Sequence, residues 1–245
     1  MERPDNYESL TTLNISYKKL TELPSWVSEC KNLEILNCSL NKITQLDNLP
    51  TGLKELNCYS NNITNLNNLP PTLKILNCEY NKLTQLDNLP PTLEVLECYC
   101  NNITQLDNLP STLKKLNCYS NKIIHLDNLP LTLKNLDCLY NKITQLDNLP
   151  PTLKILNCDN NYITQLNNLP PMLNILICCS NKITQLDNLP ETLETLECSN
   201  NQITQLDNLP KNVNSLWCTQ NPLKYDFKLT LKNIRNYNNQ NKLQK

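Results

Sequence analysis

Ten cysteines recur at a strict interval of twenty residues along this chain. The series is Cys38, Cys58, Cys78, Cys98, Cys118, Cys138, Cys158, Cys178, Cys198 and Cys218. The same frame surrounds each of them, and in the first regular copy it reads Leu33, Leu36, Cys38, Asn41, Ile43, Leu46, Leu49 and Pro50. A fixed period of this length predicts one small structural unit copied many times.

Each unit begins with a short stretch that alternates in polarity. Leu36 and Cys38 point one way, while Ile35, Asn37 and Ser39 point the other, which indicates a half-buried strand. The rest of the unit carries one proline near its end, or two in several copies, so no helix of ordinary length fits there. We expect an extended or polyproline-like return path.

One unit cannot fold alone. Each buried apolar side chain contributes roughly 1.5–3 kcal/mol, whereas fixing the backbone costs roughly 1–2 kcal/mol for every residue of the unit. Stacking against neighbours must supply the difference. The sequence therefore predicts a solenoid with a parallel β-sheet on its concave face, return loops on its convex face and little helix.

An asparagine recurs where each unit must turn out of its strand, from Asn41 and Asn61 through to Asn221. A carboxamide has two donors and an acceptor, so an inward asparagine can satisfy the backbone groups that the turn leaves unpaired. We expect the stacked copies to form an asparagine ladder.

The frame of Leu33, Leu36, Cys38, Asn41 and Ile43 resembles the LxxLxLxxNxL signature of leucine-rich repeats, with cysteine in the third leucine position. The closing Leu-Pro and the short unit resemble the repeats of bacterial effectors. The abundant Asn, Lys and Ile resemble leucine-rich repeat proteins of giant amoeba-infecting viruses. The resemblance covers roughly residues 10 to 223 and implies the fold much more strongly than any function.

Three parts are predicted. Residues 1–32 form an N-terminal cap with a divergent first repeat, in which Trp26 lies in an insertion that we expect to add a helical turn and to cap the core. Residues 33–224 form the regular repeats, and residues 225–245 form a C-terminal cap and frayed tail. The alternative for the last part is a partner-binding helix over about Leu229 to Tyr237.

The thirteen cysteines predict free, buried thiols rather than a disulfide framework. In-register parallel strands would place the cysteines about 4.8 Å apart with parallel Cα–Cβ directions, which is poor geometry for bridging. The first residues have no apolar signal-like run, and no stretch is long and apolar enough to span a membrane. We expect a cytoplasmic protein, in the host cytoplasm if it is viral or an effector.

Catalysis, cofactor binding and metal binding are not expected. His125 is the single histidine and is predicted on a return loop, away from the off-ladder thiols Cys100 and Cys179. Gly52 is the single glycine, so no phosphate-cradling loop can be built. Neither the Cys98 and Cys100 pair nor Cys178 and Cys179 matches a common zinc pattern.

A protein partner would bind the outward residues of the sheet, which the core leaves free to vary. The predicted contact residues are Tyr59, Tyr99 and Tyr119 with their neighbours Asn57, Asn77, Glu97 and Asn117. The alternative is that these tyrosines simply stack as good strand residues. Tyr80 and Tyr140 are expected at the rim.

A second candidate surface is an apolar strip made of Ile175, Ile177, Cys179 and Trp217, unless the terminal segment covers Trp217. Nucleic acid is an unlikely partner, because Glu34, Glu94 and Glu194 interrupt a row of lysines and the net charge is −1. The sequence thus predicts a non-catalytic interaction scaffold, monomer favoured, and the resemblance to effector repeats implies a host-directed effector or adaptor. The alternative is a structural component that self-associates through the apolar strip.

Overall fold

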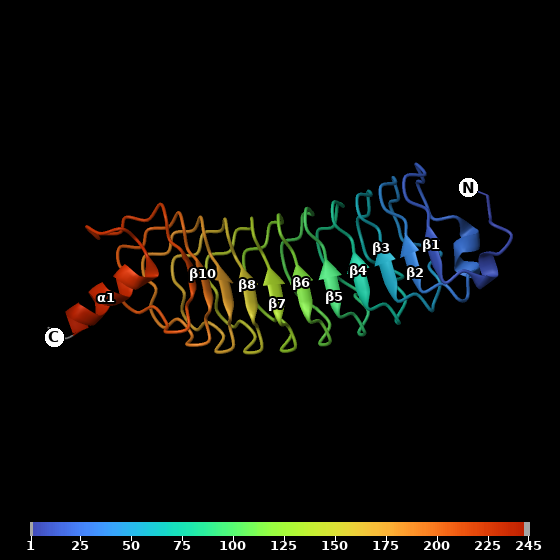
Figure 1. Cartoon of the computed structure of the whole chain (residues 1–245). Coiled ribbons are helices and arrows are strands. Elements are labelled where there is room, and N and C mark those ends of the chain that lie inside the picture. Colours follow the sequence, from blue (N-terminus) through green and yellow to red (C-terminus); the bar gives the residue numbers. More distant parts are fainter. Residues whose placement is uncertain (1, 243–245) are drawn as a thin grey trace.

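The computed structural model describes residues 2–242, which form one long, gently curved array of stacked turns (Figure 1). Its single sheet has eleven parallel strands in sequential order, one from each turn. This arrangement is the leucine-rich repeat solenoid. From residue 38 to residue 214 the return loops carry turns and no helix, in agreement with their prolines.

Every strand has three residues. They are β1 (Thr12–Asn14), β2 (Ile35–Asn37), β3 (Glu55–Asn57), β4 (Ile75–Asn77), β5 (Val95–Glu97), β6 (Lys115–Asn117), β7 (Asn135–Asp137), β8 (Ile155–Asn157), β9 (Ile175–Ile177), β10 (Thr195–Glu197) and β11 (Ser215–Trp217). The helical elements are the short 3-10 helices η1 (Tyr7–Ser9) and η2 (Ser25–Glu29) and the α-helix α1 (Leu231–Lys242).

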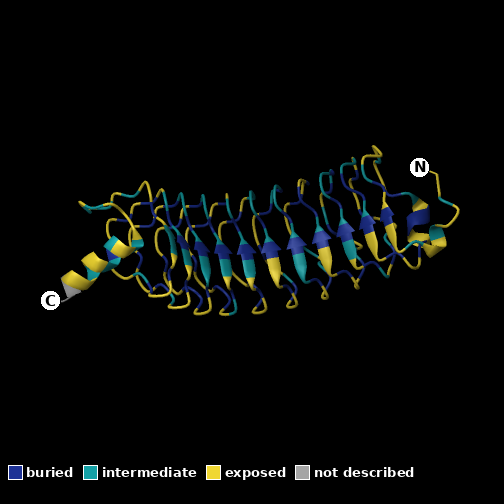
Figure 2. Cartoon of the chain, in the orientation of Figure 1, coloured by how far each residue is buried: buried dark blue, intermediate teal, exposed yellow. Residues whose placement is uncertain are grey.

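The core repeats once per turn, because neighbouring strands pair in register, as Leu36 does with Leu56. Leu33, Leu36, Cys38 and Ile43 are fully buried in the first regular repeat, and the same positions are buried along the array (Figure 2). All ten ladder cysteines are buried free thiols, and burial raises the pKa of Cys38 to about 12. These thiols act as small apolar side chains.

The predicted asparagine ladder is confirmed. In one copy, Asn61 Nδ2 donates to the carbonyl oxygens of Cys38 and Cys58, each at 3.1 Å. Asn61 Oδ1 accepts the backbone N–H of Ile43 at 2.9 Å. Two of these three bonds cross to the preceding repeat, so each carboxamide satisfies its own turn and joins it to its neighbour.

Replacing the central Asn121 by alanine should lower the free energy of unfolding by about 1–3 kcal/mol, because buried backbone groups lose their partners. Those groups are the carbonyls of Cys98 and Cys118 and the N–H of Ile103. Urea denaturation followed by circular dichroism measures the change. The exposed Asn214→Ala is the control, and an unchanged midpoint for Asn121→Ala would contradict the assignment.

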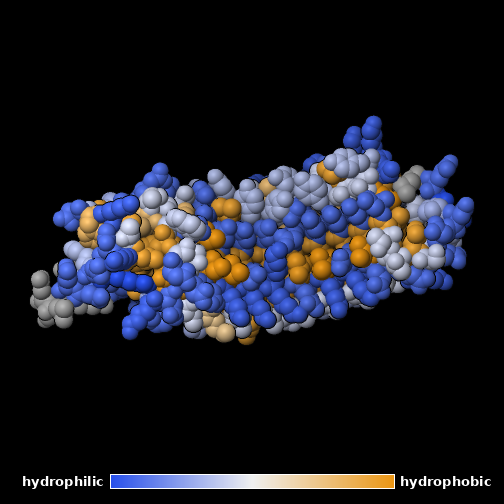
Figure 3. All heavy atoms as spheres, in the orientation of Figure 1, coloured by the Kyte–Doolittle hydropathy of each residue, from blue (hydrophilic) through white to orange (hydrophobic). Residues whose placement is uncertain are grey.

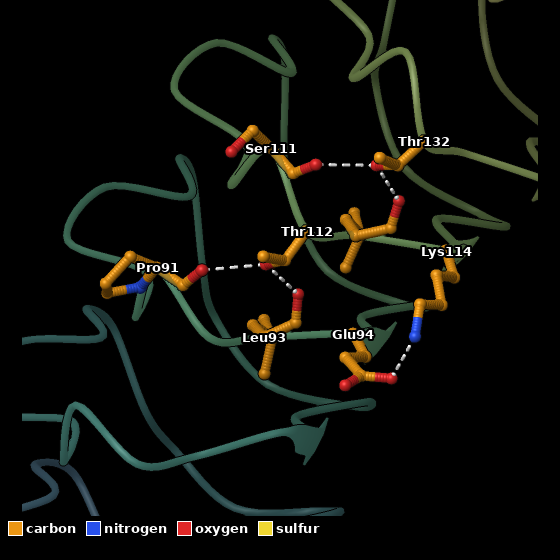
Figure 4. Close-up of polar contacts among 8 residues, drawn as sticks. Pro91, Leu93, Glu94, Ser111, Thr112, Lys114 and Thr132 are labelled. Atoms are coloured by element: carbon orange, nitrogen blue, oxygen red, sulfur yellow. Dashed lines mark hydrogen bonds and ion pairs between the residues drawn. The ribbon is translucent and has the colours of Figure 1, made fainter.

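A threonine ladder ties the return loops together (Figure 4). Thr112 Oγ1 lies 2.7 Å from the carbonyl oxygen of Pro91 and 2.8 Å from that of Leu93, both in the preceding repeat. The same pair of contacts is made by Thr72, Thr92, Thr132, Thr152 and Thr192. Sequence analysis missed this ladder.

Gly52 occupies the threonine position of its repeat. Its φ is not positive, and a Cβ built there would lie 3.6 Å from the carbonyl oxygen of Lys31, in ordinary contact. Lys31 and Leu33 are the residues whose carbonyls a threonine would reach by the spacing of the ladder.

Gly52→Thr should therefore stabilise the protein by about 1–2 kcal/mol, since it restricts the unfolded chain and adds a hydrogen bond. Gly52→Val is the matched control, because it has the branched shape without the hydroxyl and should gain less. Thermal denaturation distinguishes the two variants. Destabilisation by Gly52→Thr would show that the hydroxyl does not reach its acceptors.

Both ends of the array are capped. η2 is the helical turn expected in the N-terminal insertion, and it buries Trp26. At the other end α1 places Ile234 in the core, while Arg235 Nη2 donates to the carbonyl of Val213 at 2.6 Å. A helix thus forms in the terminal segment and packs against the last turn, and the binding of a partner by this helix stays a prediction. The frayed tail lies partly outside the described residues.

Candidate functional site

The outward side of the sheet, called the sheet face below, consists of three columns of side chains. They start at Ile35, Asn37 and Ser39 in β2 and just after it, and they repeat in every turn. Backbone pairing continues past the three-residue strands, since the N–H of Leu40 donates to the carbonyl of Tyr59 at 2.8 Å. The third column therefore stays in register with the sheet.

Five tyrosines form a continuous tyrosine ridge on this face, made of Tyr59, Tyr80, Tyr99, Tyr119 and Tyr140. Successive ring centroids lie 5.4, 5.3, 5.6 and 6.0 Å apart. Tyr59, Tyr99 and Tyr119 are half-buried, while Tyr80 and Tyr140 are 48% and 55% exposed. The three predicted tyrosines thus lie together, and their two rim neighbours complete the ridge.

Tyr80 and Tyr140 reach the ridge because of their backbone. Both have left-handed φ angles, of 50° and 51°, as does the equivalent residue of every regular repeat. A non-glycine residue adopts this conformation at a cost of about 1–2 kcal/mol. The next residue in each case is a ladder asparagine, Asn81 or Asn141, and its hydrogen bonds to the preceding repeat maintain the turn.

The predicted asparagines beside the ridge act as positioning groups. The Oδ1 atoms of Asn57, Asn77 and Asn117 accept the backbone N–H two residues on, at 3.0, 3.2 and 3.2 Å. Glu97 pairs with Lys115 at 2.6 Å. The three asparagine side chains thus hold the strand end in shape through Oδ1, and their amide N–H groups take no part in these contacts.

Sequence analysis missed a set of carboxylates on the sheet face, namely Glu79, Asp137, Asp159 and Glu197. Burial raises the pKa of all four, and that of Asp159 reaches about 6. The charges of Glu197 and Asp137 raise the pKa of Asp159 further, whereas the N–H of Cys179 lowers it. The face therefore holds acidic groups that are partly desolvated and have few positive charges nearby.

The apolar strip is not continuous. Ile175 and Ile177 are half-buried on β9, and Ile155 pairs with Ile175 in register. Glu197 of β10 separates Ile177 from Trp217, and the described part of the terminal segment leaves Trp217 53% exposed. Hydrophobic residues form several separate areas on the visible face, with hydrophilic residues between them (Figure 3).

The remaining sequence candidates lie elsewhere. His125 is exposed on a return loop. Lys54 and Lys114 of the lysine row pair with Glu34 and Glu94 at 2.5 and 2.6 Å, so part of the positive charge is neutralised. Figure 4 shows the pair of Lys114 and Glu94. Within residues 2–242 no cluster of metal-ligating side chains occurs, and no helix is long and apolar enough to cross a bilayer.

The buried charge of Asp159 should make stability depend on pH. Because its folded pKa lies above the unfolded value of 3.8, the charged form is disfavoured in the folded protein above about pH 6. That penalty falls away as the pH drops from the folded towards the unfolded pKa. Asp159→Asn keeps the acceptor for the Cys179 N–H and removes the charge.

Asp159→Asn should therefore stabilise the protein at pH 7.5 by about 1 kcal/mol, a value discounted because the side chain is only half-buried. The advantage should vanish near pH 4. Urea denaturation at both pH values measures it, with the exposed Asp187→Asn as control. A gain that is equal at both pH values would exclude desolvation as its cause.

Comparison with known proteins supports the fold. The family model for two consecutive leucine-rich repeats matches residues 8–51. The structure of YopM from Yersinia enterocolitica is 36% identical, with a TM-score of 0.82 over 89% of this chain and 48% of that one. No curated protein sequence matches the chain significantly.

Two other structures are also similar. The functional domain of InlJ from Listeria monocytogenes, described as including a cysteine ladder, is 30% identical, with a TM-score of 0.74 over 93% of this chain and 56% of that one. The repeat domain of a Shigella effector is 29% identical, with a TM-score of 0.56 over 62% and 70% of the two chains. This chain thus spans about half the length of the first two structures.

Proposed function

We propose that this leucine-rich repeat solenoid is a non-catalytic scaffold that binds a protein partner through the sheet face. The observation that carries the proposal is the tyrosine ridge, in which five rings lie in contact along one open surface. Tyrosine offers a large, rigid contact area with a polar tip, and it is enriched where proteins bind each other.

The ridge is also held in place before any partner arrives. Its backbone is fixed by the asparagine ladder and by the Oδ1 contacts of Asn57 and Asn117. A surface that is already ordered loses little conformational entropy on binding. This favours the binding function over the alternative that the rings only stack for stability.

The likeness of the repeats to those of effectors extends the proposal to a host-directed effector or adaptor that acts in the host cytoplasm as a monomer. Polar groups and tyrosine hydroxyls interrupt the apolar areas of the sheet face, which suits a face that is exposed in the free protein.

A capture experiment with matched variants tests the proposal. The ridge variant carries Tyr59→Ser, Tyr99→Ser and Tyr119→Ser, because serine occupies the same column at Ser39 and Ser199. The control carries Leu131→Ser, Tyr162→Ser and Met172→Ser, three large exposed side chains of the return loops. Both variants are first compared with wild type by thermal denaturation.

Each immobilised protein is incubated with host-cell lysate, and retained proteins are identified by mass spectrometry. A protein retained by wild type and by the control, and at least about tenfold less by the ridge variant, supports the proposal; such a loss corresponds to about 1.4 kcal/mol. Equal retention by all three proteins would place the contact off the ridge and contradict it.

Self-association is the second candidate, favoured by the open C-terminal edge of the sheet. Trp217 is 53% exposed, and Leu216 is half-buried although the equivalent leucines of β2 to β10 are buried. Sedimentation equilibrium of wild type and Trp217→Asn, the residue found at Asn37, tests it. A dimer that is weakened by the substitution supports self-association, and a monomer at all concentrations excludes it.

A further inference from the structure

Negatively charged side chains far outnumber positively charged ones on the sheet face. Its carboxylates are Glu55, Glu79, Glu97, Asp137, Asp159 and Glu197. Among the described residues, the three columns contain one cationic side chain, Lys115, and Glu97 already pairs with it. The chain as a whole has a net charge of only −1, so the imbalance belongs to this face rather than to the protein.

The tyrosine ridge lies among these carboxylates. Glu79 is 7% exposed and is hydrogen-bonded to the side chain of Tyr99. Asp137 pairs in register with Asn117. It therefore lies one repeat after the ridge residue Tyr119, in the neighbouring column. Ridge tyrosines and carboxylates therefore share the stretch of sheet from β3 to β7, and Asp159 follows at the end of β8.

Both kinds of group favour the same ligand chemistry. A guanidinium group stacks on the face of a tyrosine ring and forms paired hydrogen bonds with a carboxylate. An ammonium group can approach both, but as a point charge without the planar fork. An anionic partner such as a nucleic acid would be repelled by this face.

The spacing of the repeats suggests how a partner would lie. Neighbouring strands are about 4.8 Å apart, and an extended chain advances about 3.3 Å per residue. Glu97 and Asp137 lie in the same column, two strands apart. Asp159 and Glu197 are also two strands apart, but they lie in adjoining columns. About three residues of an extended segment span that interval, when the segment crosses the strands along the solenoid axis.

We propose that the sheet face binds an extended, arginine-bearing segment of a protein partner, laid across the strands between the tyrosine ridge and β10. The inference rests on the proposed function and names the chemical class of its partner. Arginines three residues apart would place guanidinium groups against carboxylates that lie two strands apart, either Glu97 and Asp137 or Asp159 and Glu197, with one arginine stacked on the ridge.

Fluorescence polarisation tests the inference with three labelled peptides of equal length that repeat Arg-Ser-Ser, Gln-Ser-Ser or Glu-Ser-Ser. The sheet variant carries Asp137→Asn, Asp159→Asn and Glu197→Gln. The matched control carries Asp127→Asn, Asp147→Asn and Asp187→Asn on the return loops, where all three side chains are exposed. Both variants lose three negative charges, so they differ only in where the charges were.

We expect saturable binding of the Arg-Ser-Ser peptide to wild type and to the control variant. The sheet variant should bind about tenfold more weakly, and so should the ridge variant, in keeping with about 1.4 kcal/mol of lost contact. The Gln-Ser-Ser and Glu-Ser-Ser peptides should not bind. Both triple carboxylate variants should keep the wild-type thermal midpoint or exceed it, which excludes unfolding as the cause.

Three outcomes would overturn the inference. Equal weakening by the sheet and control variants would mean non-specific attraction to a negatively charged protein. Binding of the neutral or acidic peptide that depends on the ridge would mean a different class of partner. Absence of saturable binding would reject the arginine-bearing segment, and ridge-dependent capture from lysate would still leave the proposed function standing.

Discussion

The rest of the structure depends on the hydrogen bonds that the asparagine at the end of each strand makes with the backbone of two adjacent turns. Each carboxamide bonds a carbonyl of its own turn and two backbone groups of the turn before it. A repeat therefore cannot satisfy its own backbone without a successor. This reciprocal dependence converts a unit that is too small to fold into an array with nearest-neighbour cooperativity.

The same dependence explains the two ends. Asn221 still serves the N–H of Ile203, and within residues 2–242 the segment after β11 forms no further strand. Arg235 and Asn238 of α1 take over by donating to the carbonyls of Val213 and Leu206. The helix covers the return-loop side of the last turn, whereas the strand side, with Leu216 and Trp217, stays more open.

Much of the fold could be predicted from the sequence, because the period and the alternation act over short distances. Leu36 and Cys38 mark a strand within five residues, and the ladder cysteines and most ladder asparagines are buried where the frame places them. Thr112 could not be interpreted in this way. A threonine after a proline looks like a solvent-facing loop residue, and its acceptors lie in another repeat.

The surface was less predictable than the core. Tyr80 stands outside the alternating column, and only its left-handed backbone brings the ring against Tyr59 and Tyr99. Asp137 and Asp159 belong to different columns and neighbouring repeats, yet the charge of Asp137 raises the pKa of Asp159. Trp217 looked like part of a strip with Ile177, but the register places Glu197 between them. Surface chemistry of this kind depends on contacts between residues far apart in the sequence.

The in-register pairing of neighbouring strands makes length an adjustable property of this protein. Regular turns meet the next through the same asparagine and cysteine contacts, and six of them through the same threonine contacts, so a whole unit of twenty residues can be removed or duplicated without changing the kind of contact on either side. Such an event would shift every later outward residue by one strand spacing. A gene with this architecture can therefore reshape its binding surface by recombination between repeats, while the code for its core stays the same.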